Sequence, residues 1–142
     1  MEIKIAAKEE IDAVLALRVE VFVGEQGVPP HIELDAEDEG ALHIIAIENG
    51  VTVGCARVIL HHGAAHIGRL AVKKSYRGRG TGTAICRFVI DHCRACGCTR
   101  IWLNAQLHAV GFYEKLGFVP RGEVFVEAGM EHIEMTMNGG EA

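Results

Sequence analysis

The sequence predicts one α+β domain of the three-layer type, in which helices flank a central mixed, mostly antiparallel sheet. Segments that alternate polar and apolar residues recur along the chain, separated by segments with helical periodicity. Asn49-Gly50 separates two apolar segments and is a strong hairpin signal. The 142 residues suit a single core, so we expect one domain over residues 1–137 and a frayed tail over residues 138–142.

The elements are expected in the order βα(α)βββαβαββ. Residues 2–6 alternate as a strand does, and apolar residues over residues 8–23 recur at the spacing of an amphipathic helix. Val28-Pro29-Pro30 ends this helix, and the acidic stretch over residues 33–39 is a loop or a short second helix. The next three strands are expected at residues 42–48, 51–60 and 66–72.

The C-terminal half begins with a helix over residues 80–95, and Gly97 lies just past its end, where glycine closes helices. The apolar stripe of this helix is expected to comprise Ile85, Phe88, Val89 and His92. The remaining elements are a strand over residues 100–104, a helix over residues 107–116 ended by Gly117, and strands over residues 118–126 and 131–137.

The composition narrows the class of protein. Hydrophobic residues make up 49% and charged residues 23%, as in a folded globular chain, and no apolar stretch approaches the roughly 18 residues of a membrane span. The net charge of −5 argues against a general nucleic-acid or anionic-membrane binder. The N-terminus has no apolar signal region, so we expect a cytoplasmic protein whose five cysteines are free thiols.

A cysteine cluster, Cys93-Arg94-Ala95-Cys96-Gly97-Cys98, invites comparison with zinc motifs. A structural zinc site needs a second, similarly spaced pair of ligands, which the sequence lacks. We therefore expect no metal, and interpret these cysteines as small hydrophobic residues at the end of a helix.

The segment most informative about function is Arg77-Gly78-Arg79-Gly80-Thr81-Gly82-Thr83, which joins a strand to a helix. The free N–H groups and the dipole of the helix start form an anion site suited to a phosphate or pyrophosphate. It is not a Walker A loop, because Gly82 is followed by Thr83-Ala84, and it lacks the third glycine and the downstream acid of a dinucleotide fingerprint. The alternative is a glycine-rich helix start that binds nothing.

Read as Arg-x-x-Gly-x-Gly, this loop resembles the acetyl-CoA pyrophosphate loop of the GNAT family of N-acetyltransferases. Leu103-Asn104-Ala105-Gln106 and Gly111-Phe112-Tyr113-Glu114-Lys115-Leu116-Gly117-Phe118 are similar to the family's fifth strand and its tyrosine-bearing helix. The resemblance covers about residues 3–137 and implies the GNAT acyl-CoA N-acyltransferase fold. Residues 18–26 and 129–135 resemble the ElaA/YjcF-like subgroup, whose substrates are poorly defined.

The resemblance implies acetyl-CoA as co-substrate. Main-chain groups of Leu70 and Val72 would bind the pantetheine arm together with Asn104, the loop N–H groups would bind the pyrophosphate, and Tyr113 would donate to the departing thiolate. The implied cofactor site comprises Leu70, Ala71, Val72, Arg77, Gly78, Arg79, Gly80, Thr81, Gly82, Thr83, Asn104 and Tyr113.

The general base is less well defined. We expect the strand register to place His66, Gly68, Leu70 and Val72 on one face, and His66 occupies the position where some family members carry a glutamate. Its ordinary pKa of ~6.5 suits a base near neutrality. Glu33 is a second candidate, with His132 and Glu134 as further alternatives, or the amine loses its proton to water.

The first functional hypothesis is an acetyl-CoA-dependent N-acetyltransferase that transfers the acetyl group directly to a primary amine of a small molecule or a protein. The alternative is a non-catalytic acyl-CoA-binding or sensing module on the same fold, and Tyr113 favours the enzyme. The acidic residues of the stretch 33–39 are either a solvated face or an attractor for the cationic amine. Because dimers are common in this family, a homodimer is also compatible with the sequence.

Overall fold

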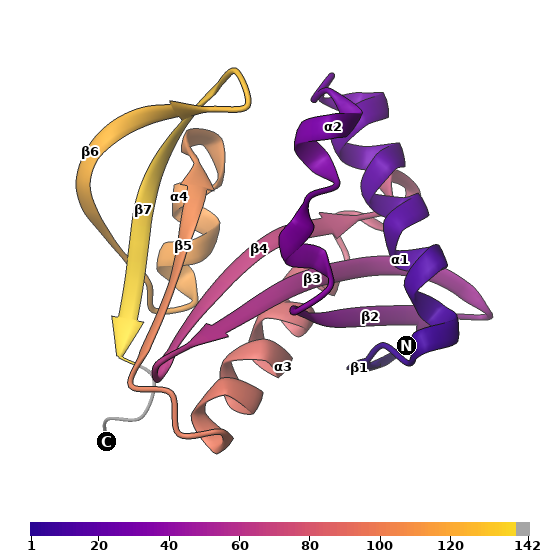
Figure 1. Cartoon of the computed structure of the whole chain (residues 1–142), viewed down its shortest axis with the longest axis horizontal. Coiled ribbons are helices and arrows are strands. Elements are labelled where there is room, and N and C mark those ends of the chain that lie inside the picture. The colour runs from indigo at the N-terminus through magenta and orange to yellow at the C-terminus, as the bar shows by residue number, and fades with distance from the viewer. Residues whose placement is uncertain (139–142) are drawn as a thin grey trace.

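The computed structural model describes residues 1–138, and its centre is a seven-stranded sheet of order β1-β2-β3-β4-β5-β7-β6 (Figure 1). Neighbouring strands are antiparallel except β4 and β5, which are parallel. The predicted α+β class with a mixed, mostly antiparallel sheet is confirmed. The strands are β1 Glu2–Ile5, β2 Leu42–Glu48, β3 Val51–His61, β4 Ala64–Val72, β5 Arg100–Gln106, β6 Val119–Glu127 and β7 Met130–Asn138.

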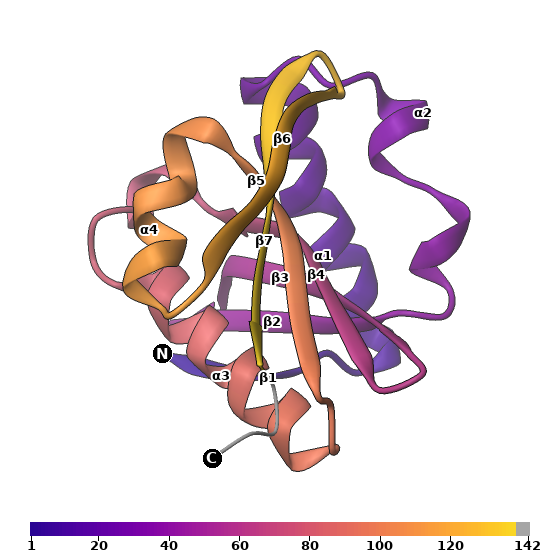
Figure 2. The same cartoon turned by 90° about the vertical axis from the view of Figure 1, so that its left-hand side faces the viewer.

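Helices cover both faces of the sheet (Figures 1 and 2). On one face α1, through Val14 and Leu17, packs with Cys55 and Ala71 of the sheet, and on the other α3 and α4 close the main core. No helix in the described part of the chain is long and apolar enough to cross a membrane. The helices are α1 Ile11–Arg18, α2 Pro30–Glu33, α3 Thr81–Ala95 and α4 Val110–Lys115, with shorter helical turns η1 Lys8–Glu10, η3 Ala36–Asp38, η4 Lys74–Tyr76 and η5 Leu107–Ala109.

The segment predicted as the first helix is helical along its whole length, but the type of helix changes within it. After α1 the chain continues as a π-helical segment, η2 Val19–Glu25. Such wide turns are uncommon and frequently occur at functional sites. Here the segment brings Phe22, Glu25 and the following Gln26 to the wall of the cavity described below.

The predicted stripe of α3 is displaced. Ile85 and Val89 are buried as expected, but the other buried residues of the helix are Thr81, Cys86, Ile90 and Cys93. Phe88 and His92 are only half-buried and lie beside each other, with ring centroids 6.4 Å apart. Helical periodicity therefore predicted the helix correctly, but the centre of its buried face lies about one residue from the predicted position.

Strand β4 corrects a second prediction. Arg57 pairs with Gly68 but Cys55 pairs with Ala71, so Arg69 is an extra residue, a β-bulge, and has a positive φ of 52°. The bulge reverses the alternation of faces. His66 and Gly68 lie on the face of Arg57, whereas Leu70 packs into the core on the α3 side together with the neighbouring Val72.

Several boundaries also differ from the prediction by one or two residues. Strand β4 starts at Ala64, because the hairpin turns at His62 and Gly63, both of which have positive φ angles. Asn138, which we expected in a frayed tail, belongs to β7, and residues 139–142 lie outside the described residues.

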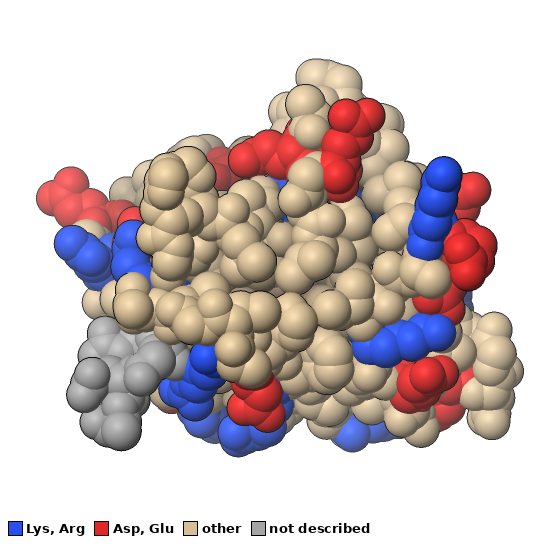
Figure 3. Space-filling view, turned by 60° about the horizontal axis from the view of Figure 1, so that its bottom comes forward, with Lys and Arg blue, Asp and Glu red and all other residues tan. Residues whose placement is uncertain are grey.

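The parallel pair β4–β5 creates the opening for a site. These strands pair only from Ala64 to Ile67 with Arg100 to Leu103, and beyond this point they diverge (Figure 1). The β5-facing edge of residues 68–72 therefore has no strand partner. On the surface seen in Figure 3, cationic and anionic side chains are interspersed among uncharged ones, with no large area of one sign.

Candidate active site

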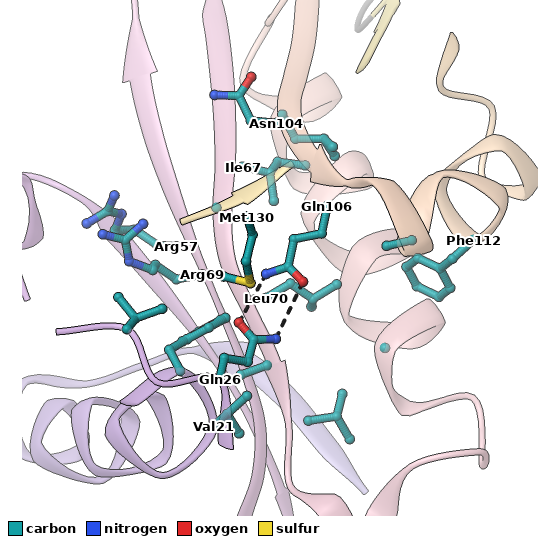
Figure 4. A pocket seen from close by; sticks show the side chains of 18 of the residues that line it. Val21, Gln26, Arg57, Ile67, Arg69, Leu70, Asn104, Gln106, Phe112 and Met130 are labelled. Atoms are coloured by element: carbon teal, nitrogen blue, oxygen red, sulfur yellow. Dashed lines mark hydrogen bonds between the residues drawn. The ribbon is translucent and has the colours of Figure 1, made fainter. Parts of the chain in front are cut away.

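A cavity of about 880 Å³ occupies the gap between β4 and β5. Its walls come from η2 and α2 on one side, from α4 and the β6–β7 turn on the other, and from the start of α3 at one end (Figure 4). The predicted site residues that line it are Glu33, His66, Leu70, Ala71, Val72, Arg77, Gly78, Gly80, Thr81, Gly82, Thr83, Asn104 and Tyr113.

The glycine loop leaves main-chain donors at the start of α3 without a capping side chain. Gly78 and Gly80 have φ angles of 77° and 81°, a left-handed region that glycine adopts without strain. Because Gly80 is the N-cap of α3, no capping side chain takes the N–H groups of residues 81–83. These donors, together with the dipole of a 15-residue helix, favour a phosphate or pyrophosphate at this end of the cavity.

The two arginines of the loop are placed differently. Arg77 lines the cavity, donates from Nε to the main-chain oxygen of Val72 at 2.9 Å, and pairs with Glu25 at 2.8 Å. Arg79 does not line the cavity. Its guanidinium lies over the Tyr76 ring, 5.0 Å from the centroid, and 3.8 Å from a carboxylate oxygen of Glu48.

Tyr113 projects from α4 into the cavity wall. Its ring packs edge-on against Phe112 and Phe118, at centroid distances of 5.0 and 6.0 Å. Burial raises the pKa of the phenol, so the hydroxyl keeps its proton at neutral pH and can act as a donor. Gly117, at a φ of 104°, ends α4 as predicted and lets the chain turn back into β6.

His66 lies opposite Trp102 in the β4–β5 pair, and the two rings stack in parallel with centroids 3.8 Å apart. Burial and the nearby positive charge of Arg57 lower the pKa of the imidazole. A neutral imidazole on the wall of the cavity is suited to accept a proton.

Glu33 has a different environment. Its side chain is 3% exposed and pairs with Arg18 at 2.7 Å and with Arg69 at 2.8 Å. Burial raises the pKa of this carboxyl, and the two guanidinium groups act against that rise. With its oxygens engaged by two cations, Glu33 is better placed to hold the wall of the cavity than to accept a proton from an amine.

The two remaining candidates for the general base, His132 and Glu134, are also engaged in other contacts. His132 lines the cavity, but its Nδ1 is 2.8 Å from the main-chain oxygen of Met130. Glu134 accepts a hydrogen bond from Arg100 at 2.8 Å and does not line the cavity. Among the residues weighed as bases, His66 therefore has the most favourable position.

The structure divides the acidic stretch: Glu37 and Glu39 are exposed, as a solvated face requires, whereas its other acids pair with arginines. Asp35 and Asp38 pair with Arg57 at 2.7 and 3.1 Å, and Asp38 also pairs with Arg18 at 2.7 Å. Although burial acts in the opposite direction, hydrogen bonds from these arginines lower the pKa of Asp38 to about 2. The acids of this ionic cluster, defined as Arg18, Glu33, Asp35, Asp38, Arg57 and Arg69, are neutralised by its arginines.

Sequence reasoning did not identify the arginines of this cluster. A signal was available, since Arg18 falls on the apolar stripe of the first helix and Arg57 lies within an apolar strand. A charge in a buried pattern requires a buried partner. Phe22, Gln26 and Met130, which also line the cavity, fall in segments that resemble the subgroup, but no residue type or spacing marked them as site residues.

Two of the three clustered cysteines, Cys93 and Cys98, match the interpretation as packing residues. All five cysteines are free; Cys93 and Cys98 are buried, while Cys96 is exposed near His92, with Sγ and Nε2 3.5 Å apart. Within residues 1–138, no group of three His, Cys, Asp or Glu side chains is arranged to hold a metal ion.

The diverging parallel strands, the glycine loop before α3 and the tyrosine on α4 define the acyl-CoA N-acyltransferase architecture. Residues 6–138 match the model of the acetyltransferase (GNAT) domain. The chain belongs to the GNAT family and is an N-acetyltransferase.

Individual relatives and solved structures are similar to this chain over nearly its whole length. The chain is 34% identical to the N-acetyltransferase YjcF of Bacillus subtilis over 90% of this chain and 92% of that protein. It is 29% identical to the crystal structure of Escherichia coli ElaA, with a TM-score of 0.87 over 96% of this chain and 99% of that one. The fold alone is shared with an aminoglycoside 6′-N-acetyltransferase complexed with coenzyme A, at 16% identity and a TM-score of 0.79 over 100% and 99% of the chains.

Proposed function

We propose that this N-acetyltransferase uses acetyl-CoA and transfers the acetyl group directly to a primary amine of a small molecule or a protein. The observation that carries the proposal is the continuity of the cavity. One space is lined by the anion-binding loop, the unpaired edge of β4, the Tyr113 phenol and the His66 imidazole.

The hydrogen-bonding groups of the cavity support acetyl-CoA as the co-substrate. The glycine loop supplies N–H donors to an anion, and the open edge of residues 68–72 supplies main-chain groups to an extended, amide-bearing arm. A Cβ at Gly82 would lie 3.5 Å from the Phe112 ring, so the loop is closely packed against α4 without clashing. When bound, acetyl-CoA supplies the acetyl group as an activated thioester.

Two side chains then have defined tasks. His66, kept neutral by burial and by Arg57, takes the proton that the amine must lose. Tyr113, kept protonated by burial, donates a hydrogen bond to the sulfur as negative charge develops there. Because burial disfavours the phenolate, the Tyr113 hydroxyl keeps its proton and remains a hydrogen-bond donor.

A thiol-release assay with acetyl-CoA and a panel of primary amines tests the proposal. We expect free thiol to appear with at least one amine, and mass spectrometry to find the acceptor heavier by one acetyl group. If the protein binds CoA tightly but releases thiol with no amine of the panel, the non-catalytic binding function replaces this one.

A further inference from the structure

Trp102 is the only tryptophan of the chain, and it lies directly beside the His66 imidazole. The register of the parallel pair places the two residues opposite each other on β4 and β5. Their rings are 3.8 Å apart between centroids and 2° from parallel, so the indole covers one face of the imidazole. His66 lines the cavity, whereas Trp102 does not.

The stack on Trp102 is the directional contact that His66 makes. A histidine that acts as a base is usually oriented by a hydrogen bond on its second ring nitrogen. Neither ring nitrogen of His66 has such a partner within residues 1–138. The histidine rings that are hydrogen-bonded there are those of His43, His92 and His132. The plane of the His66 ring is therefore held by an aromatic face, and its nitrogens are left to substrate or water.

Trp102 is itself anchored. The Arg100 guanidinium lies 5.3 Å from the centroid of the indole, within the range of a cation–π contact, and donates to Glu134 at 2.8 Å. Arg100 and Trp102 are two residues apart on β5, and Glu134 lies on the neighbouring β7. The indole is thus fixed by side chains of two strands, and it presents a fixed surface to His66.

The reaction makes this orientation consequential. A general base must keep its nitrogen within hydrogen-bond reach of the proton, and a misplacement of about 1 Å can cost about 10²-fold in rate. An imidazole without a hydrogen-bonded partner would otherwise rotate away from that position. We propose that Trp102 is a positioning residue, whose stacked indole fixes the plane of the His66 imidazole so that a ring nitrogen faces the amine; this inference rests on the proposed function.

The first test reads the stack without an acceptor. A protonated imidazole quenches a neighbouring indole, and Trp102 is the only tryptophan, so its fluorescence should fall as His66 takes up a proton. We expect this step below pH 6.5, over the range in which circular dichroism is unchanged, and we expect His66→Gln to lack it. The other charges that act on this titration are kept in the variant, namely Arg57, Arg69, Glu127 and Glu134. An identical titration in His66→Gln overturns the proposal.

The second test is a double-mutant cycle on kcat, measured as thiol release from acetyl-CoA with the most active primary amine of the panel. Trp102→Leu should lower kcat at least about 10-fold with unchanged acetyl-CoA affinity, and Trp102→Phe, which keeps an aromatic face, should recover most of the loss. In the His66→Gln background, Trp102→Leu should cost less than about 2-fold, because no base is left to position. If Trp102→Leu melts too early to assay, Trp102→Met takes its place.

Phe125→Leu is the matched control. Phe125 stacks on His132, another histidine of the cavity, with ring centroids 5.9 Å apart. Because this stack does not hold His66, its removal should leave kcat unchanged. A loss equal to that of Trp102→Leu overturns the proposal, since it reports a general sensitivity of the sheet.

The outcomes separate the positioning role from the proposed function. If the wild type binds CoA but acetylates no amine, the proposed function fails and the positioning role fails with it. If the wild type is active but Trp102→Leu keeps its kcat, or loses as much without His66 as with it, the positioning role is overturned while the proposed function stands.

Discussion

Replacing Arg18 with methionine is expected to lower the free energy of unfolding by about 3 kcal/mol. Arg18 is 1% exposed and donates to Glu33 Oε1 and Asp38 Oδ1, both at 2.7 Å, and to the main-chain oxygen of Glu33 at 2.8 Å. Methionine fills similar volume but leaves a buried carboxylate and a buried carbonyl without this donor.

The magnitude follows from the remaining contacts. Removing one partner of a buried ion pair typically costs about 3–5 kcal/mol, because the other charge stays buried. In this cluster Arg69 remains 2.8 Å from Glu33 and Arg57 remains 3.1 Å from Asp38, so we expect the lower end of that range. This is a large share of the roughly 5–15 kcal/mol that stabilises a typical domain.

The acid side of the stability profile provides a second measurement. The folded pKa of Asp38 is about 2, against an ordinary value of 3.8, so its contribution is present above pH 3.8 and is lost as the pH falls through 2. The shift of nearly two units corresponds to about 2 kcal/mol. Without Arg18 this shift shrinks, so the penalty of the substitution is largest near neutrality and smaller in acid.

Urea denaturation of wild type and Arg18→Met at several pH values is the assay. Lys4→Met, which removes a solvent-accessible ion pair of 3.0 Å, serves as the control and should change stability far less than Arg18→Met does. The double variant Arg18→Met/Glu33→Gln should recover part of the loss, because it removes the uncompensated charge. A loss below about 1 kcal/mol, or no recovery in the double variant, would refute the reasoning.

Three further predictions concern the reaction. Tyr113→Phe should lower kcat by at least about 10²-fold with an unchanged Tm and CoA affinity, whereas early melting with normal turnover would show a packing role only. Gly80→Asp should raise the Kd of acetyl-CoA at least about 10-fold in calorimetry, and more than Gly80→Ala, which shares the backbone strain of a φ of 81° without the charge. If His66 is the base, kcat should fall with acid through a pKa below 6.5 and His66→Gln should remove this limb; a limb that persists in the variant contradicts the assignment.

Much of the fold was predictable from local pattern. The hairpin at Asn49-Gly50, the glycines that end α3 and α4, and the strand–loop–helix around the glycine loop all depend on interactions between near neighbours in the chain. Near-neighbour rules for turns and helix ends operate in any tertiary context. The glycine loop and the helix that carries Tyr113 were accessible for the same reason, since each is a short contiguous motif.

What the sequence alone could not decide depends on contacts between distant segments. Whether Glu33 faces an amine or an arginine is set by Arg18 and Arg69, which lie 15 and 36 positions away. The faces of His66 and Leu70 are set by the extra residue at Arg69, because one bulge reverses the period-two alternation of a strand. The Gln26–Gln106 hydrogen bond, drawn in Figure 4, exists only because the diverging β4 and β5 leave a gap that two side chains can span. Local propensity selected the elements, and long-range charge pairing and strand register selected what each side chain of the site contacts.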